Sequence, residues 1–148
     1  NILFKLPAKI DDSAVPWVTY CDPELAHVGL SIAEAKAKYG ADNISILSTP
    51  LSDNDRAIAE SRTEGMVKII THKKGRILGA SILAPAAGEM ILAWAVAITA
   101  RQKISTMASV IAPYPTYGDA SKRVAGSFYS DKLFSPRIRK IVQFLLKF

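Results

Sequence analysis

The order in which strand-like and helix-like segments follow one another constrains the fold of this chain most. Short runs rich in β-branched and aromatic residues, which indicate strands, occupy residues 16–20, 27–30, 43–51, 66–71 and 76–83. The last two runs form a hairpin signal, because Gly75 between them supplies the positive φ that a tight turn requires. Most helix-like segments come after these strands. This order predicts an α+β fold in which helices cover an antiparallel sheet.

Two helix signals stand out in the first two thirds of the chain. Ser31 and Glu34 have the spacing of a capping box, which begins a helix. That helix is expected to end at Tyr39, where Gly40 offers a left-handed cap. Residues 88–101 are apolar on almost every face, so they are expected to form a buried helix.

A loop punctuated by proline, residues 112–119, precedes the last helices. A short helix is expected before it, at residues 105–109. Asp119 is expected to cap a helix that runs to about residue 130. Ser135, followed by proline in the first turn, begins one more helix.

The last helix is predicted to be amphipathic. Its apolar residues recur at i, i+3, i+4 and i+7, opposite a basic face, and are Ile138, Ile141, Val142 and Leu145. Such a helix suits a membrane surface, a dimer interface or packing on the sheet. Packing is favoured, and membrane contact is not expected.

Composition is typical of one globular domain. The chain has 148 residues, of which 49% are hydrophobic, enough for a single core. Its net charge of +6 comes mostly from scattered basic residues without interleaved aromatic residues, so no nucleic-acid partner is expected. The longest apolar run is too short for a membrane span, and no signal peptide is evident. A cytoplasmic location is therefore expected.

The few cysteine and histidine residues give no sign of redox or metal chemistry. Cys21 is the only cysteine, so it forms no internal disulfide, and it is expected to be buried. His27 and His72 lie far apart in the sequence and are expected to have structural roles or to contact solvent. No metal site is expected.

Several short motifs occur in an order that is similar to that of a known family. Residues 15–30 read Val-Pro-Trp-Val-Thr-Tyr-Cys-Asp-Pro-Glu-Leu-Ala-His-Val-Gly-Leu. The further motifs are Ala33-Glu34-Ala35 before Tyr39-Gly40, Arg56-Ala57, Gly65, Arg76-Ile77-Leu78-Gly79-Ala80 and Glu89-Met90-Ile91. Together they resemble the dimerisation domain of the pyridine nucleotide–disulfide oxidoreductases, such as dihydrolipoamide dehydrogenase, glutathione reductase and mercuric reductase.

The resemblance implies a division of the chain into three parts. Because the chain begins with Asn1, residues 1–14 are expected to lead in from a preceding FAD-binding domain. Residues 15–130 are expected to be the dimerisation domain, and residues 131–148 a helical extension.

The resemblance also implies a site in the proline loop. Family members carry His-Pro-Thr and, three residues later, Glu, which reach the redox site of the partner subunit. Here Tyr114-Pro115-Thr116 and Asp119 occupy those positions. Tyr114 and Asp119 are therefore the candidate catalytic pair, and Tyr114 and Pro115 are expected near the partner's flavin, with a cis bond between them. The alternative is an ordinary loop tyrosine followed by a helix cap.

The tyrosine departs from the family pattern in a way that affects chemistry. A phenol titrates near pH ~10, so Tyr114 is a poor proton acceptor at neutral pH but a good hydrogen-bond donor. The electron acceptor of this protein is therefore expected to differ from a disulfide.

The function implied is that of a homodimerisation domain without activity of its own. The chain contains no GxGxxG motif, so it is expected to hold no cofactor itself. FAD and NAD(P)H are implied for the full-length protein, where further domains of the same chain would bind them. A non-catalytic interaction domain and a membrane-peripheral module are the alternatives.

Overall fold

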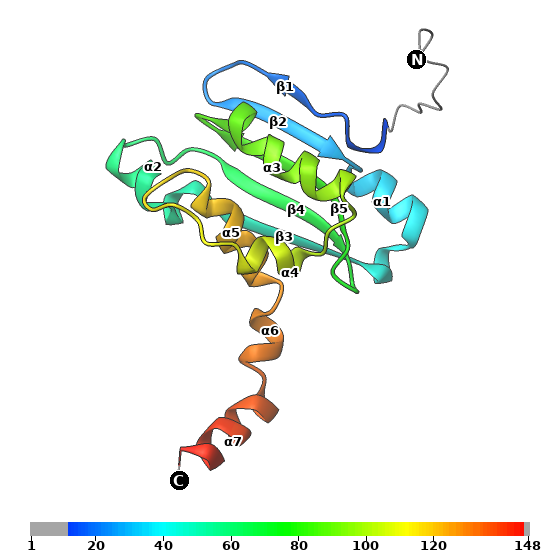
Figure 1. The fold of residues 1–148 in the computed structure, drawn as a ribbon, viewed down its shortest axis with the longest axis vertical. Helices are drawn as coiled ribbons and strands as arrows, with labels where there is room; N and C mark the ends of the chain where they lie inside the picture. The colour runs from blue at the N-terminus through cyan, green and yellow to red at the C-terminus, as the bar shows by residue number, and fades with distance from the viewer. Residues whose placement is uncertain (1–11, 147–148) are drawn as a thin grey trace, which may run out of the picture.

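A single antiparallel sheet forms the centre of the molecule (Figure 1). The computed structural model describes residues 12–146, without the side chains of residues 13, 131, 132, 137 and 139–141. The strands are β1 (Trp17–Thr19), β2 (Glu24–Gly29), β3 (Ile44–Pro50), β4 (Met66–His72) and β5 (Ile77–Ala84). They are ordered β1-β2-β5-β4-β3, and each neighbouring pair is antiparallel.

Helices flank the sheet on both faces. The helices are α1 (Ile32–Tyr39), α2 (Asp55–Ala59), α3 (Ala87–Thr99), α4 (Ile104–Ser109), α5 (Asp119–Ser127), α6 (Ser130–Leu133) and α7 (Pro136–Leu145). Short 3₁₀ turns occur at Asp12–Ala14, Ala41–Asn43 and Leu51–Asp53. On one face α3 packs over β2 and β5, and α5 packs over β3 and β4. The predicted α+β fold is confirmed.

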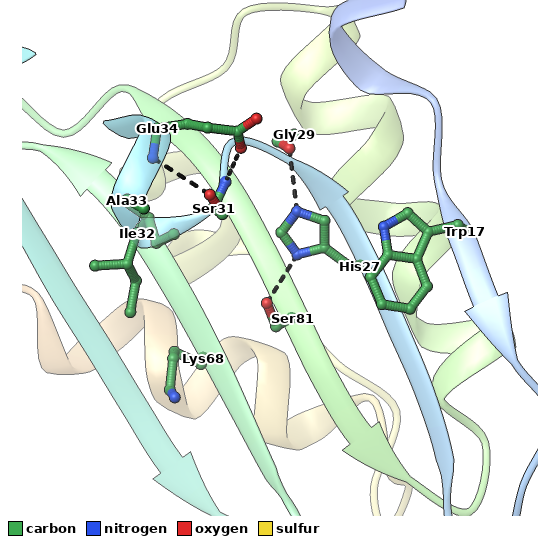
Figure 2. Close-up of a pocket in the computed structure, with 10 residues that line it drawn as sticks. Trp17, His27, Gly29, Ser31, Ile32, Ala33, Glu34, Lys68 and Ser81 are labelled. Atoms are coloured by element: carbon green, nitrogen blue, oxygen red, sulfur yellow. Dashed lines mark hydrogen bonds between the residues drawn. The ribbon is translucent and has the colours of Figure 1, made fainter. Parts of the chain in front are cut away.

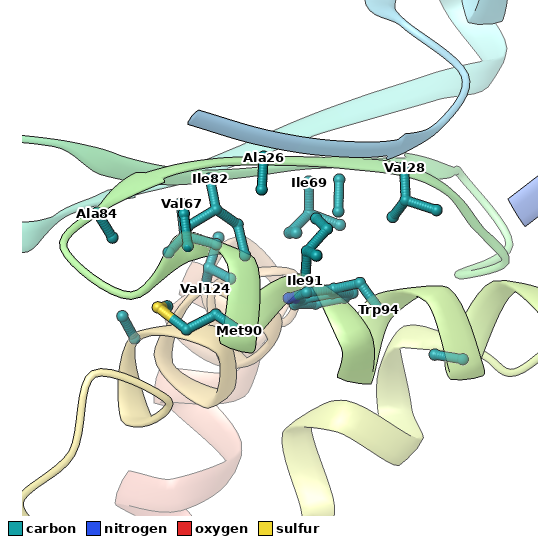
Figure 3. Close-up of a cluster of buried hydrophobic side chains, with 14 of the residues drawn as sticks. Ala26, Val28, Val67, Ile69, Ile82, Ala84, Met90, Ile91, Trp94 and Val124 are labelled. Atoms are coloured by element: carbon teal, nitrogen blue, oxygen red, sulfur yellow. The ribbon is translucent and has the colours of Figure 1, made fainter. Parts of the chain in front are cut away.

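The main core lies between the sheet and these two helices. Figure 3 shows Val28 and Ile69 directed from the sheet toward Ile91 and Trp94 of α3. Trp94 is fully buried, and its indole Nε1–H donates a hydrogen bond of 3.1 Å to the Ser121 hydroxyl of α5. This bond satisfies a polar group that burial would otherwise leave without a partner.

Within residues 12–146, the second face of the sheet is covered by a helix at one end only. There α1 packs on a small cluster of buried residues, Ala35, Ile44, Ile70 and Leu78. The capping box is present in full, because the Glu34 backbone N–H donates to the Ser31 hydroxyl and the Ser31 backbone N–H donates to the Glu34 carboxylate. Gly40 ends α1 with a φ of 81° and a ψ of 145°, so its φ is positive as expected but its conformation is not the predicted left-handed helical one.

Some sequence predictions need correction. The helix α3 is not buried on all sides, because Leu92 and Val96, one turn apart, are 62% and 60% exposed. Asp119 is the first residue of α5, and Gly118 holds the N-cap position without a side-chain bond. Cys21 is exposed, since it lies in the turn between β1 and β2. The short helix α2 was not predicted.

The last two helices extend away from the sheet (Figure 1). Ser135 caps α7 by accepting a hydrogen bond from the Ile138 backbone N–H, as predicted. The predicted packing of α7 on the sheet is wrong for this chain, because Val142 and Leu145 remain exposed. The Ile141 side chain and residues 1–11 lie outside the described part of the chain. No helix within residues 12–146 combines the length and the apolar character that crossing a bilayer requires.

Candidate functional site

The proline loop between α4 and α5 is bonded to the start of α2. Asn54, which is only 1% exposed, is the residue that makes this connection. Its carbonyl oxygen accepts a hydrogen bond of 3.0 Å from the Ala57 backbone N–H and so caps α2. Its amide nitrogen donates a hydrogen bond of 3.0 Å to the Thr116 carbonyl. One buried side chain therefore holds the helix and the loop together.

The loop is also braced internally and carries a cis peptide bond. The Thr116 hydroxyl donates a hydrogen bond of 2.8 Å to the Pro113 carbonyl. The Tyr114–Pro115 bond is cis, which confirms the expectation. A second cis bond, Asp22–Pro23, was not predicted.

Two tyrosines of the loop reach acidic residues of α2 and its C-cap. The Tyr114 hydroxyl donates a hydrogen bond of 2.9 Å to the Asp55 carboxylate. The Tyr117 hydroxyl donates a hydrogen bond of 2.8 Å to the Glu60 carboxylate, which also accepts from the Arg56 side chain. Loop and helix are thus joined by three side-chain bonds, counting the one from Asn54.

These contacts shift the titration of the groups involved. The hydrogen bond to Asp55 and its negative charge raise the pKa of Tyr114. Partial burial, followed by the bond to Glu60, raises the pKa of Tyr117. The bonds from Tyr117 and Arg56 lower the pKa of Glu60. At neutral pH both phenols are therefore protonated donors, and the Glu60 carboxylate is a charged acceptor.

The partner of Tyr114 within this chain is Asp55 rather than the Asp119 that the resemblance implies. The Asp119 carboxylate lies 3.8 Å from the Arg123 guanidinium, one turn along α5. Its charge still contributes to the raised pKa of Tyr114. Asn54 as an N-cap before α2 is the signal that could have indicated this segment. Nothing local, however, links Asp55 to a tyrosine 59 positions later.

An open pocket of about 760 Å³ lies on the other face of the sheet (Figure 2). A row of paired cross-strand residues crosses it, namely Trp17, His27, Ser81 and Lys68. The His27 ring bonds through Nδ1 to the Ser81 hydroxyl at 2.9 Å and through Nε2 to the Gly29 carbonyl at 3.1 Å. Because a carbonyl only accepts, Nε2 donates to the Gly29 carbonyl.

The pocket and the proline loop are separate features. No residue of the loop lines the pocket. His27 links β2 to β5 and orders the end of β2, which agrees with the structural role expected for it. The loop therefore remains the candidate functional site.

Comparison with known proteins identifies the family. Residues 15–125 match the family described as "Pyridine nucleotide-disulphide oxidoreductase, dimerisation domain". The chain belongs to this family. The match ends within α5, so α6 and α7 lie beyond the matched residues.

Relatives of the dimerisation domain include two kinds of enzyme. This chain is 36% identical over 125 residues to a mercuric reductase of Shewanella putrefaciens, and the match covers 84% of this chain and 22% of that protein. It is 39% identical over 122 residues to the mitochondrial dihydrolipoyl dehydrogenase of Rattus norvegicus, covering 80% of this chain and 24% of that protein. The chain thus spans about a quarter of the length of these relatives.

Solved structures show the same fold. LpdA from Mycobacterium tuberculosis superposes with a TM-score of 0.77 at 28% identity, over 85% of this chain and 27% of that one. The HOCl-induced flavoprotein disulfide reductase RclA from Escherichia coli gives a TM-score of 0.77 at 27% identity, over 84% of this chain and 29% of that one. The dimerisation domain therefore keeps the family fold.

Proposed function

We propose that this dimerisation domain joins two copies of a longer flavoenzyme and that each copy presents Tyr114-Pro115-Thr116 to the flavin and redox site of its partner. The observation that carries the proposal is the contrast within the loop. Its backbone is tied to the buried Asn54, yet the Tyr114 side chain is 71% exposed. A rigid loop with an outward aromatic ring is suited to contact a second subunit.

The outer side of α3 supports a symmetric interface. Leu92 and Val96 are exposed one turn apart, on a helix whose opposite side packs on the sheet. A two-fold interface places the same apolar patch of both subunits together and excludes water from it. We therefore propose that the protein is a homodimer. We also propose a cytoplasmic location, as expected from the sequence.

FAD and NAD(P)H belong, in this proposal, to other domains of the longer protein and supply its electron transfer. This chain contributes a neutral phenol. Because the Tyr114 hydroxyl donates to Asp55 and its pKa is raised, the tyrosine positions groups by contact and hydrogen bonding and does not accept a proton at neutral pH. Asp119 adds negative charge beside it. This chemistry favours an electron acceptor other than a disulfide.

The homodimer is tested by measuring the molar mass of the isolated chain. Light scattering at tens of micromolar, about the range in which a moderate interface is populated, is expected to give twice the 16.0 kDa of one chain. The isolated chain is also expected to be colourless. A monomeric mass, or a bound flavin, would contradict the proposal.

The role of the loop is tested in the longer protein. Tyr114→Ala is expected to shift the flavin absorption spectrum, because the proposal places the ring at the partner's flavin. Tyr20→Ala, at an exposed tyrosine in the turn between β1 and β2, is the matched control and is expected to leave the spectrum unchanged. If Tyr114→Ala leaves the flavin spectrum as unchanged as Tyr20→Ala does, Tyr114 does not lie at the flavin. A longer protein without flavin would favour a non-catalytic interaction domain.

A further inference from the structure

The helix α7 presents an apolar side that the other residues of the described range, 12–146, leave exposed. It projects away from the sheet (Figure 1) and lies beyond residues 15–125, which match the family. Leu145 is 63% exposed and Leu146 is 80% exposed, and Val142 is exposed as well. Uncovered apolar side chains grouped on one helix indicate a contact surface.

The charge pattern of this segment indicates what covers that side. Residues 135–148 include no acidic residue, and their basic residues are Arg137, Arg139, Lys140 and Lys147. At 100° per residue, Ile138, Val142 and Leu145 share one side of the helix, whereas Lys140 and Gln143 fall on the opposite side. The segment thus combines an apolar stripe with a basic side, on which Phe144 also lies.

We propose that α7 lies flat on an anionic lipid surface, with its apolar stripe among the acyl chains and its basic residues at the phosphate headgroups. Its 10 residues are about half of what a membrane span needs, so an interfacial position fits its length. This inference goes beyond the proposed function and does not depend on it. The sequence favours packing of this helix on the sheet, but the apolar stripe is exposed, so we propose a lipid surface instead.

Lipid suits the charge of α7 better than a second copy of the chain does. A second copy would bring an identical basic helix to the contact, and like charges repel at short range. An anionic bilayer instead attracts basic residues and offers an apolar phase for the stripe. The net charge of +6 on the whole chain adds to this attraction.

The test is co-sedimentation of the whole 148-residue chain with lipid vesicles. One set contains phosphatidylcholine alone, and the other contains about 30% phosphatidylglycerol, for which we expect binding at least about tenfold stronger. Two variants with the same charge change separate the contribution of the apolar stripe to vesicle binding from that of electrostatic attraction. Leu145→Glu places a carboxylate on the stripe, whereas Gln143→Glu places it on the polar side.

We expect Gln143→Glu to weaken binding to the anionic vesicles about fivefold, the effect of one charge near the surface. Leu145→Glu is expected to weaken it at least about tenfold further, because it also removes the apolar contact. Circular dichroism and light scattering check that both variants keep the fold and the mass of the parent chain.

Three results would overturn the proposal. The first is no binding of the parent chain to anionic vesicles, and the second is equal binding to both vesicle types. The third is an equal loss for Leu145→Glu and Gln143→Glu. A change of oligomeric mass in Leu145→Glu without a loss of vesicle binding would assign the stripe to a protein contact instead. None of these results bears on the role of Tyr114.

Discussion

Asn54 links the candidate site to the fold at the scale of a single residue. Both ends of its amide are used, one to cap α2 and the other to hold the Thr116 carbonyl. Because the side chain is buried, each lost bond leaves a backbone group without a partner. The geometry of the proline loop therefore depends on a residue that is not part of the loop.

Replacing Asn54 is expected to destabilise the chain. Asn54→Ala removes the cap and the bond to the loop, and should lower the free energy of unfolding by about 2 kcal/mol in urea titrations. Asn54→Asp keeps the cap but sets a carboxylate oxygen against the Thr116 carbonyl. Amide exchange should then remain slow in α2 and become faster in the loop. Equal exchange in parent and variant loops would contradict this role.

The bond from Tyr117 to Glu60 should make stability depend on pH. Because the pKa of Glu60 is lowered by this bond, its contribution is present above the ordinary value of 4.5 and is lost as pH falls through the folded value. The raised pKa of Tyr117 means that the bond is fully present below about pH 10 and is lost as pH rises through the folded value of the phenol.

Tyr117→Phe tests this dependence directly. The variant should unfold at a lower temperature than the parent at pH 7, because it lacks the hydroxyl donor. The difference should shrink at an acidic pH below the lowered folded pKa of Glu60, where the carboxylate becomes protonated. Tyr20→Phe, at an exposed tyrosine, is expected to match the parent at both pH values. A pH-independent difference would mean that the hydrogen bond does not stabilise the fold.

At the scale of elements, the backbone of β5 at Gly79 lies close to the backbone of Leu30, just before α1. A side chain at Gly79 of β5 would place its Cβ 2.1 Å from the Leu30 carbonyl oxygen. Real Cβ atoms do not approach backbone oxygen so closely, so only glycine fits between β5 and Leu30. The covered end of the second sheet face depends on this contact.

Two glycine substitutions should therefore change stability in opposite directions. Gly79→Ala should lower the free energy of unfolding by about 3 kcal/mol, because the backbone must move to admit the methyl group. Gly126→Ala in α5, where a Cβ meets no atom within 4 Å, should raise it by about 0.7 kcal/mol through helix propensity. Urea titrations of both variants measure the difference. A neutral Gly79→Ala would show that the contact is loose.

At the scale of the whole molecule, the two faces of the sheet are covered by different elements. One face carries α3 and α5, and the proposal directs α3 and the proline loop before α5 toward a second subunit. The other face is covered by α1 at one end and forms the open pocket beside it. The core between sheet and helices makes the outer side of α3 a rigid surface.

The dimer is expected to fail when that surface is charged. Val96→Glu should convert the chain to a monomer in light scattering while its circular dichroism stays unchanged, because the carboxylate would be buried without a partner in the interface. Ala37→Glu makes the same charge change at an exposed position of α1, away from α3, and should remain dimeric. If both variants keep the parent mass, the interface lies elsewhere.

Local patterns in the sequence determined much of this protein. The order of strands before helices, the capping box at Ser31 and the hairpin turn at Gly75 depend on residues a few positions apart, and all were predicted. The same holds for the motifs that indicated the family. Short-range hydrogen bonds and backbone preferences suffice to specify such features.

Only the tertiary structure decided which distant groups meet. The pairing of Tyr114 with Asp55 joins residues 59 positions apart, and that of Asn54 with the Thr116 carbonyl joins residues 62 apart. The exposed sides of α3 and α7 likewise depend on which surfaces the sheet buries. An apolar pattern shows that a helix has a surface to cover, but only the packing of the whole chain determines whether its own residues cover it.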